Sequence, residues 1–473
     1  MLKRTIGYLR KTRTLLTILL IVFFLKGVAF SAVLPMLQGF DEPNHFSNIQ
    51  HFSFSRLDPD EFGRETSRQK TDLRKDTQNI NFDQVRNTFF NTPNFTEGIK
   101  GAGEDEMIEN TQDRNYTAFP EKYSFSAFAR IMSTVNWLLG SHDLLFRFFF
   151  LRIISVLFGV IIVYLAFLLA KSAGFSENAS LLFAAILAFQ PMLTNVTSII
   201  NYDVMLVLAF TLFIYAGINL IRFGFSRKFL FLSILAVVLG IFTKGTGIIL
   251  FGLFVIVFLY AFQKKYKLSK IKILVMAFSF LAICSVLTYF FSPFSLQKLN
   301  LFESKSDFKS FSHSISSYYS ETVDSFELYS LTLWGNFGWI NAPISIRLLH
   351  VIWVLELISL IGLLIFLIRR NNPDFLPSKI TVIFLMLVFL TLECGVRFAD
   401  WRLFDYRGHI ILGTSGRYFI PALASQLMLM AIGWGTFVKK ESSFKIILKA
   451  GLALMVLLHC YSVLSIMIPR YYL

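Results

Sequence analysis

The chain has 473 residues, of which 55% are hydrophobic, and its mean hydropathy of +0.60 excludes a water-soluble globular protein. Repeated apolar runs of about 18 residues or more predict a polytopic helical membrane protein. The net charge of +15 could suggest nucleic-acid binding. However, the Lys and Arg residues lie in short clusters between apolar runs, so we expect no nucleic-acid partner.

The first predicted element is an N-terminal segment and transmembrane helix, residues 1–36. A basic region is followed by an apolar run from Leu15 to Met36, and about 22 residues are long enough to cross a bilayer of about 30 Å. We therefore interpret it as a retained span rather than a cleaved signal peptide. Lys26 interrupts the run, and we expect it to snorkel or to pack against a neighbouring helix.

The chain as a whole predicts an all-α polytopic membrane protein with about 11 transmembrane helices. The predicted spans lie near residues 14–36, 144–170, 179–200, 204–221, 229–243, 246–262, 273–292, 348–368, 380–396, 418–438 and 446–468. Basic residues dominate every second connection, and by the positive-inside rule this places the N-terminus in the cytoplasm and the C-terminus outside.

Residues 37–146 form a large first extracytoplasmic loop in this topology, and they carry 17 of the 30 acidic residues of the chain. An apolar stripe at helical spacing between residues 116 and 139 predicts an amphipathic helix on the membrane or on the bundle. Residues 147–473 are expected to form the main transmembrane bundle, with further outer loops at 293–347 and 397–417.

Unusual polar residues collect at the predicted outer ends of the spans. Asp41, Glu42 and His45 follow span one; Arg152 lies near the start of span two; Asn201 and Asp203 separate spans three and four; Lys244 separates spans five and six; Arg417 and Tyr418 precede span ten. Charged groups at membrane depth need partners. The acids are suited to an acceptor hydroxyl or a metal, and Lys and Arg to an anion such as a lipid phosphate.

Four of these residues also have a purely structural interpretation, and two others could hold a metal ion. Asp41 and Asp203 could cap helices, since Asp41 precedes Pro43 and Asp203 precedes an apolar run. Lys244 and Arg417 could be interfacial anchors. Glu42 and His45 are spaced to face one ligand on a helix, which leaves open a site for a divalent cation such as Mg or Mn.

Five separated segments resemble the signature of a bacterial membrane-protein family placed in the GT-C superfamily of integral-membrane glycosyltransferases. They are Phe40-Asp41-Glu42-Pro43-Asn44-His45, Leu151-Arg152, Gln190-Pro191 with Asn201-Tyr202-Asp203, Gly335-Asn336-Phe337-Gly338-Trp339, and Gly416-Arg417-Tyr418-Phe419-Ile420-Pro421. The Asp-Glu-Pro-x-His and Gly-Arg-Tyr-x-x-Pro segments are the more specific ones. The segments around Trp334, Gly335 and Gly338 are expected to shape a packed loop rather than to do chemistry.

The resemblance implies a GT-C-like enzyme of the bacterial plasma membrane with its active site on the extracytoplasmic side. Such an enzyme transfers a sugar, with inversion if the attack is direct, from a polyprenyl-phosphate-linked donor to a glycan, lipid or protein acceptor. Our hypothesis makes Asp41 the general base, with Glu42 positioning the acceptor or a cation. Lys244, Arg417 and Arg152 would hold the donor phosphate, and His45, Asn201, Asp203 and Tyr418 would support the site.

Two other functions fit the same residues. A transporter or flippase of lipid-linked glycans would use the charges to line a path, although no inverted repeat is evident and the polar groups lie at one end of the spans. A non-catalytic membrane protein of envelope assembly would use the acidic loop to bind partners.

Overall fold

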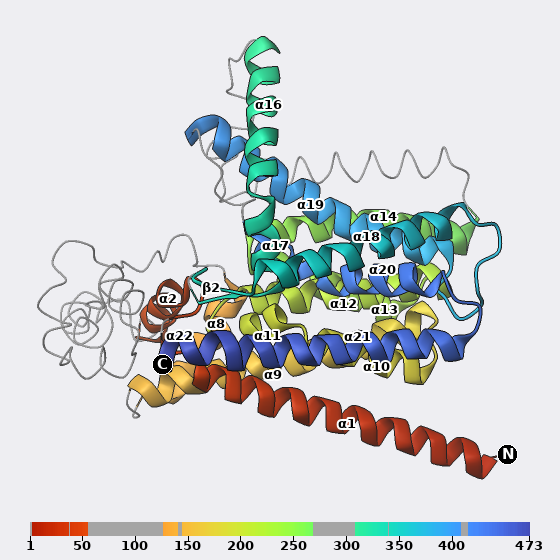
Figure 1. Ribbon diagram of the computed structural model, residues 1–473, viewed down its shortest axis with the longest axis horizontal. Helices are drawn as coiled ribbons and strands as arrows, with labels where there is room; N and C mark the ends of the chain where they lie inside the picture. Colours follow the sequence, from red (N-terminus) through yellow and green to blue (C-terminus); the bar gives the residue numbers. More distant parts are fainter. Residues whose placement is uncertain are drawn as a thin grey trace, which may run out of the picture.

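The computed structural model describes residues 2–36, 38–54, 126–140, 144–267, 308–338, 340–407 and 415–473. In these residues the chain is an all-α bundle whose long helices run side by side along one axis (Figure 1). Eight helices are long and apolar enough to cross a membrane, and a bent pair makes a ninth candidate. The protein is therefore a multi-pass membrane protein.

The elements follow one another from a long N-terminal helix to a short C-terminal one. The first half contains α1 (Leu2–Val33), α2 (Glu42–Phe54), α8 (Ala127–Leu138), α9 (Leu144–Ala173), α10 (Glu177–Ala188), α11 (Pro191–Thr197), α12 (Asp203–Phe223), α13 (Arg227–Ile241), the 3-10 turn η2 (Gly245–Gly247) and α14 (Ile248–Tyr266). The second half contains α16 (Phe308–Asp324), α17 (Phe326–Trp334), β1 (Asn336–Phe337), β2 (Ala342–Pro343), α18 (Ile346–Ile368), α19 (Lys379–Arg407), η3 (Gly416–Ala422), α20 (Leu423–Gly435), α21 (Glu441–Tyr461), the π-helical turn η4 (Ser462–Met467) and α22 (Ile468–Tyr472).

Eight of the predicted spans coincide with the eight candidate membrane spans of the bundle, some of which join an α-helix to an adjacent 3-10 or π-helical turn. The span predicted at 229–243 is α13, a helix of 15 residues that is short for a bilayer crossing. The span predicted at 273–292 lies outside the described residues, and the total of about 11 stays a prediction. The two chain ends lie at opposite ends of the bundle (Figure 1).

The span predicted at 179–200 is broken into α10 and α11, which meet at an angle of 67°. The break falls at Gln190-Pro191, where the Gln190 side chain accepts a hydrogen bond from the Leu193 amide at 2.5 Å and Pro191 opens the new helix. Lys26 of α1 reaches into the break and donates to the Ala188 carbonyl and, at 2.8 Å, to the Thr194 hydroxyl. Lys26 therefore packs against a neighbour and bonds the C-terminal end of α10, where a cation is favourable.

Helix α12 is the central helix, because it is apolar on all sides and almost entirely buried. It packs against α9, α13 and α14 and also touches η3. Its first residue, Asp203, lies at the end of the bundle where α1 ends and α2 begins, which we call the α2 end. The C-terminus lies at the same end (Figure 1).

One short helix, α8, lies at the α2 end. In α8, residues such as Phe128 and Met132 are buried, and the helix packs against α2. It confirms the helical stripe predicted within 116–139, except that residues 116–125 lie outside the described part. Helix α16 stands across the long helices in Figure 1 and contacts α17 and α19.

Helices α18 and α20 approach each other through small residues. A Cβ added to Gly433 would lie 2.0 Å from the Ser359 carbonyl oxygen, and one added to Gly362 would lie 2.1 Å from the Gly433 carbonyl oxygen. Ser359 also donates to the Met430 carbonyl at 3.0 Å. Small residues of this kind bring membrane helices into close backbone contact.

We predict that Gly433→Ala lowers the free energy of unfolding by about 1–3 kcal/mol, the usual cost of overpacking. Gly252→Ala in α14 is the matched control, because a Cβ there meets nothing within 4 Å. Thermal denaturation in detergent measures both variants. Equal stability of the two would contradict the close contact between α18 and α20.

Candidate functional site

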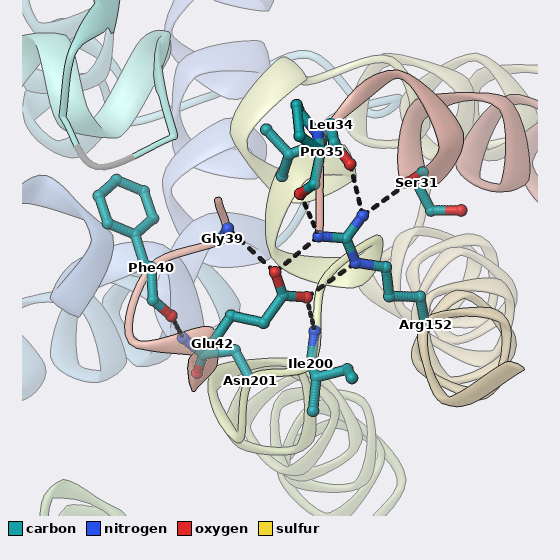
Figure 2. A network of polar contacts seen from close by, with 9 residues as sticks. All are labelled: Ser31, Leu34, Pro35, Gly39, Phe40, Glu42, Arg152, Ile200 and Asn201. Atoms are coloured by element: carbon teal, nitrogen blue, oxygen red, sulfur yellow. Dashed lines mark hydrogen bonds and ion pairs between the residues drawn. The ribbon is translucent and has the colours of Figure 1, made fainter. Parts of the chain in front are cut away.

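A buried ion pair between Glu42 and Arg152 organises the α2 end (Figure 2). Arg152 donates to Glu42 through Nε to Oε1 at 2.8 Å and through Nη2 to Oε2 at 2.6 Å, and neither side chain is exposed to solvent. The remaining guanidinium donors reach three carbonyl oxygens at the end of α1. These belong to Ser31 at 2.7 Å, Leu34 at 2.5 Å and Pro35 at 2.8 Å.

The Glu42 carboxylate is saturated in the same way. Besides Arg152, it accepts the Gly39 amide at Oε2 over 3.0 Å and the Ile200 amide at Oε1 over 2.9 Å. All five N–H donors of Arg152 and the lone pairs of Glu42 are thus in use. Arg152 has no donor left for a phosphate, and Glu42 has no free oxygen for an acceptor or a cation.

These contacts change two expectations. The structure places Arg152 behind the loop that carries Asp41, as the counter-ion of Glu42, rather than with Lys244 and Arg417. A metal held by Glu42 and His45 does not fit either, because the Glu42 oxygens are occupied. Among the described residues, no group of three or more His, Cys, Asp or Glu side chains could hold a metal ion.

Asp41 is held in an unusual backbone conformation directly before α2. Its φ of 53° is left-handed, which non-glycine residues adopt at a cost and which occurs often at functional sites. Its carbonyl oxygen accepts the His45 amide at 3.1 Å, so the backbone of Asp41 starts the first turn of α2. Its carboxylate, however, accepts a hydrogen bond from Arg417 Nη2 at 2.6 Å and is 36% exposed.

A third acid–cation pair, Asp203 with Lys244, lies beside the pair of Asp41 and Arg417. Lys244, in the tight turn before η2, donates to Asp203 Oδ1 at 2.8 Å. Its ammonium also lies 4.7 Å from the centre of the Tyr202 ring and 4.5 Å from that of Tyr418. A cation between two aromatic faces and a carboxylate is well stabilised even where water is scarce.

Aromatic rings and the Asn201 amide join the Asp41–Arg417 pair to the Asp203–Lys244 pair. The Arg417 guanidinium lies over the rings of Phe40 and Tyr418, at 4.8 and 5.0 Å, and donates to the Tyr418 hydroxyl at 3.2 Å. Asn201 links the two acidic loops, because it donates to the Phe40 carbonyl and accepts the Asp203 amide, both at 2.8 Å. Tyr418 therefore touches both cations.

The Gly-Arg-Tyr-x-x-Pro segment forms η3. Close packing explains why its first residue, Gly416, is a glycine. A Cβ there would lie 2.3 Å from the Tyr329 carbonyl oxygen of α17, and the Gly416 amide donates to Thr332 Oγ1 at 2.5 Å. Close packing on α17 therefore aims Arg417 and Tyr418 at the Asp41 loop.

The Gly335–Gly338 segment lies elsewhere, as expected for a packed loop. It contains β1, which pairs antiparallel with β2, and Phe337 packs edge-on against Phe30 of α1 with ring centres 5.9 Å apart. Trp339 lies outside the described residues.

Burial and the nearby charges together set the ionisation of Asp41 and His45. Burial alone would raise the pKa of Asp41, but Arg417 and the other nearby positive groups outweigh it, so the pKa lies below its ordinary value. Burial lowers the pKa of His45 to about 4, against the opposing effect of Asp41 and Asp203. At neutral pH Asp41 is therefore ionised and His45 is neutral, with its ring edge-on to Tyr202 at 4.3 Å.

Sequence reasoning did not single out Phe40 or the ring of Tyr202. Each directly precedes an acid predicted to lie in the site, and this adjacency was the only signal for them in the sequence. An aromatic residue next to a span is, however, more often part of the interfacial belt. Their role is visible only once Lys244 and Arg417 are placed over them.

The molecule is thus a multi-pass helical membrane protein with three acid–cation pairs, Glu42–Arg152, Asp41–Arg417 and Asp203–Lys244, at one end of its bundle. Residues 23–425 match the family described as "Predicted membrane protein (DUF2142)". The chain belongs to this family, and the match covers all the site residues described above, from Phe40 to Tyr418. A search of curated proteins found no match.

We predict that Glu42→Gln lowers the free energy of unfolding by about 3–5 kcal/mol, because Arg152 is left buried without its counter-ion. The matched control is Glu441→Gln, which removes the partially exposed pair with Lys445 and should cost less than about 1 kcal/mol. Thermal denaturation compares the two. Similar losses would show that the Glu42–Arg152 pair does not organise the fold.

We also predict that stability falls as the pH drops from about 6.5 towards 4, because the unfolded chain protonates His45 while the folded chain does not. This contribution amounts to about 1.4 kcal/mol per pH unit. His45→Gln should flatten the dependence, measured as the melting temperature at several pH values, whereas His350→Gln at an exposed site should not. An unchanged slope in His45→Gln would contradict a neutral buried His45.

Proposed function

We propose that this protein is a glycosyltransferase of the GT-C type. It transfers a sugar from a polyprenyl-phosphate-linked donor to a glycan, lipid or protein acceptor in assembly of the cell envelope. In this proposal the α2 end faces the extracytoplasmic side of the bacterial plasma membrane, the N-terminus is cytoplasmic and surrounding lipids admit the prenyl chain. The family resemblance of the motifs and the asymmetric distribution of basic residues support this placement.

The observation that carries the proposal is the position of Asp41. Its carboxylate is the most exposed of the acids in the three pairs and the one beside Arg417, with Lys244 bound to the neighbouring Asp203. A base and two cations within one cluster are what transfer of a group from a phosphate to a hydroxyl requires.

The proposed reaction is a direct displacement. Asp41 takes the proton of the acceptor hydroxyl while that oxygen forms a bond to the anomeric carbon. The bond between the anomeric carbon and the phosphate oxygen breaks, and the phosphate leaves with the bonding electron pair. Arg417 and Lys244 stabilise the charge that develops on it. Attack opposite to the leaving group inverts the anomeric configuration.

The other predicted residues position this machinery. Glu42 and Arg152 fix the backbone on either side of Asp41, and Asn201 ties Phe40 to Asp203. Asp203 and Tyr418 hold Lys244, while neutral His45 packs beneath Tyr202. A Mg or Mn ion at Glu42 and His45 does not fit these contacts, and no step is assigned to one.

One observation favours the transport alternative. The break between α10 and α11, with Lys26 bound inside it, resembles the discontinuous helices that build substrate sites in transporters. A transporter would move a lipid-linked sugar across proteoliposomes without a chemical change, whereas the proposed enzyme consumes it. The described acid–cation pairs at the α2 end favour the enzyme.

We predict that Asp41→Asn lowers transfer about 100- to 10,000-fold, the usual effect of losing a general base. The assay follows consumption of a polyprenyl-phosphate sugar by the purified protein, with a membrane extract as the source of acceptor. Asp405→Asn removes an acid of α19 that accepts from Ser314 and serves as the control. Wild-type turnover by a folded Asp41→Asn variant would remove the base assignment.

A further inference from the structure

Arg417 has hydrogen-bond donors that the protein does not use. Its Nη2 serves both Asp41 and Tyr418, but Nε and Nη1 are buried and have no partner among the described residues. A buried donor left unpaired is costly, and an arginine is usually satisfied by several acceptors. Arg152 of the same cluster, by comparison, has an acceptor for every donor.

The shape of the guanidinium group decides how an anion can use these donors. A two-pronged oxyanion binds along the Nε–Nη2 edge or along the Nη1–Nη2 edge, because the third edge is blocked by the Cδ methylene. Both usable edges therefore include Nη2. Asp41 holds that atom at 2.6 Å, so Asp41 and a bidentate anion compete for the same donor.

Lys244 is less suited to be the first contact of an incoming anion. Its ammonium is bonded to Asp203, whose side chain is almost fully buried, and lies between the two tyrosine rings. The acid that neutralises Arg417 is by contrast 36% exposed. Of the two pairs, the one between Asp41 and Arg417 is more readily opened.

We propose that the phosphate of the polyprenyl lipid displaces Asp41 from Arg417, so that binding of the donor releases the carboxylate that acts as base. This inference rests on the proposed function and adds an order of events to it. In the paired state Asp41 is a poor base, since the adjacent guanidinium stabilises its ionised form. Once the phosphate has taken Arg417, Asp41 is free to accept a proton from the acceptor hydroxyl.

The surrounding contacts let the side chain move without the backbone. The residues on either side of Asp41 are fixed by hydrogen bonds. The Gly39 amide donates to Glu42, the Phe40 carbonyl accepts from Asn201, and the Glu42 carboxylate accepts from Arg152. Asp41 itself is tied through its side chain only to Arg417 among the contacts described. A rotation of the Asp41 side chain therefore suffices for the exchange.

The test is binding rather than turnover. Purified wild-type protein and the variants Asp41→Asn, Arg417→Lys and Asp405→Asn are titrated with undecaprenyl monophosphate in detergent, and bound lipid is measured by native mass spectrometry. Undecaprenol reports binding through the prenyl chain alone. Inorganic phosphate reports a site for free phosphate rather than for a lipid headgroup.

The exchange predicts that Asp41→Asn binds undecaprenyl monophosphate about tenfold more tightly than wild type, because a neutral amide competes less well for Nη2. Asp405→Asn should bind as wild type does. Arg417→Lys should bind the lipid phosphate more weakly, since a lysine lacks the paired donors of the planar guanidinium. Combining it with Asp41→Asn should remove the tighter binding that Asp41→Asn gives alone. Undecaprenol should show no difference among the proteins.

Equal or weaker binding by a folded Asp41→Asn variant would overturn the exchange while leaving the proposed function in place. An equal gain in Asp405→Asn would reduce the effect to overall charge and would also overturn it. If no protein binds the lipid phosphate, the proposed function fails as well. A gain seen for inorganic phosphate but not for the lipid would contradict a lipid-headgroup site.

Discussion

The ion pair between Glu42 and Arg152 is the interaction on which the rest of the site depends. Two charges in a region without water are stable only when every hydrogen-bonding group is matched. Here Arg152 binds the end of α1 and Glu42 binds the connection before α12. Four separate segments of the chain therefore meet at one fixed point, and Asp41 is the residue next to it.

The neighbouring pairs differ from this one in a way that matters for function. Glu42 and Arg152 are fully enclosed and complementary, whereas Asp41 is partly exposed and Arg417 has unused donors. The first pair is suited to holding the backbone and the second to exchanging partners. Aromatic rings around Lys244 and Arg417 keep both cations in place at a depth where free charges are unfavourable.

Much of the fold could be predicted because apolar runs of sufficient length report membrane spans directly. The grouping of polar residues at one end also followed from the sequence, since successive spans alternate in direction and place Asp41, Asp203, Lys244 and Arg417 at the same end. That reasoning brings residues to one end of a bundle, and the structure then shows which of them touch.

The pairing itself could not be predicted. Asp41 and Glu42 are adjacent, and nothing in the sequence indicates that one faces Arg417 and the other Arg152. That choice depends on the left-handed turn at Asp41 and on the packing of Gly416 against α17. The break at Gln190-Pro191 was missed for a similar reason, because an apolar run continues through it and only the proline signals a change of direction.

The most direct test of the account is a structure of the protein with a bound polyprenyl-phosphate sugar. We expect the phosphate oxygens within hydrogen-bond distance of Arg417, with the Asp41 carboxylate turned away from the guanidinium and facing the anomeric carbon. A phosphate bound at the break between α10 and α11, with the Asp41–Arg417 pair intact, would contradict the account.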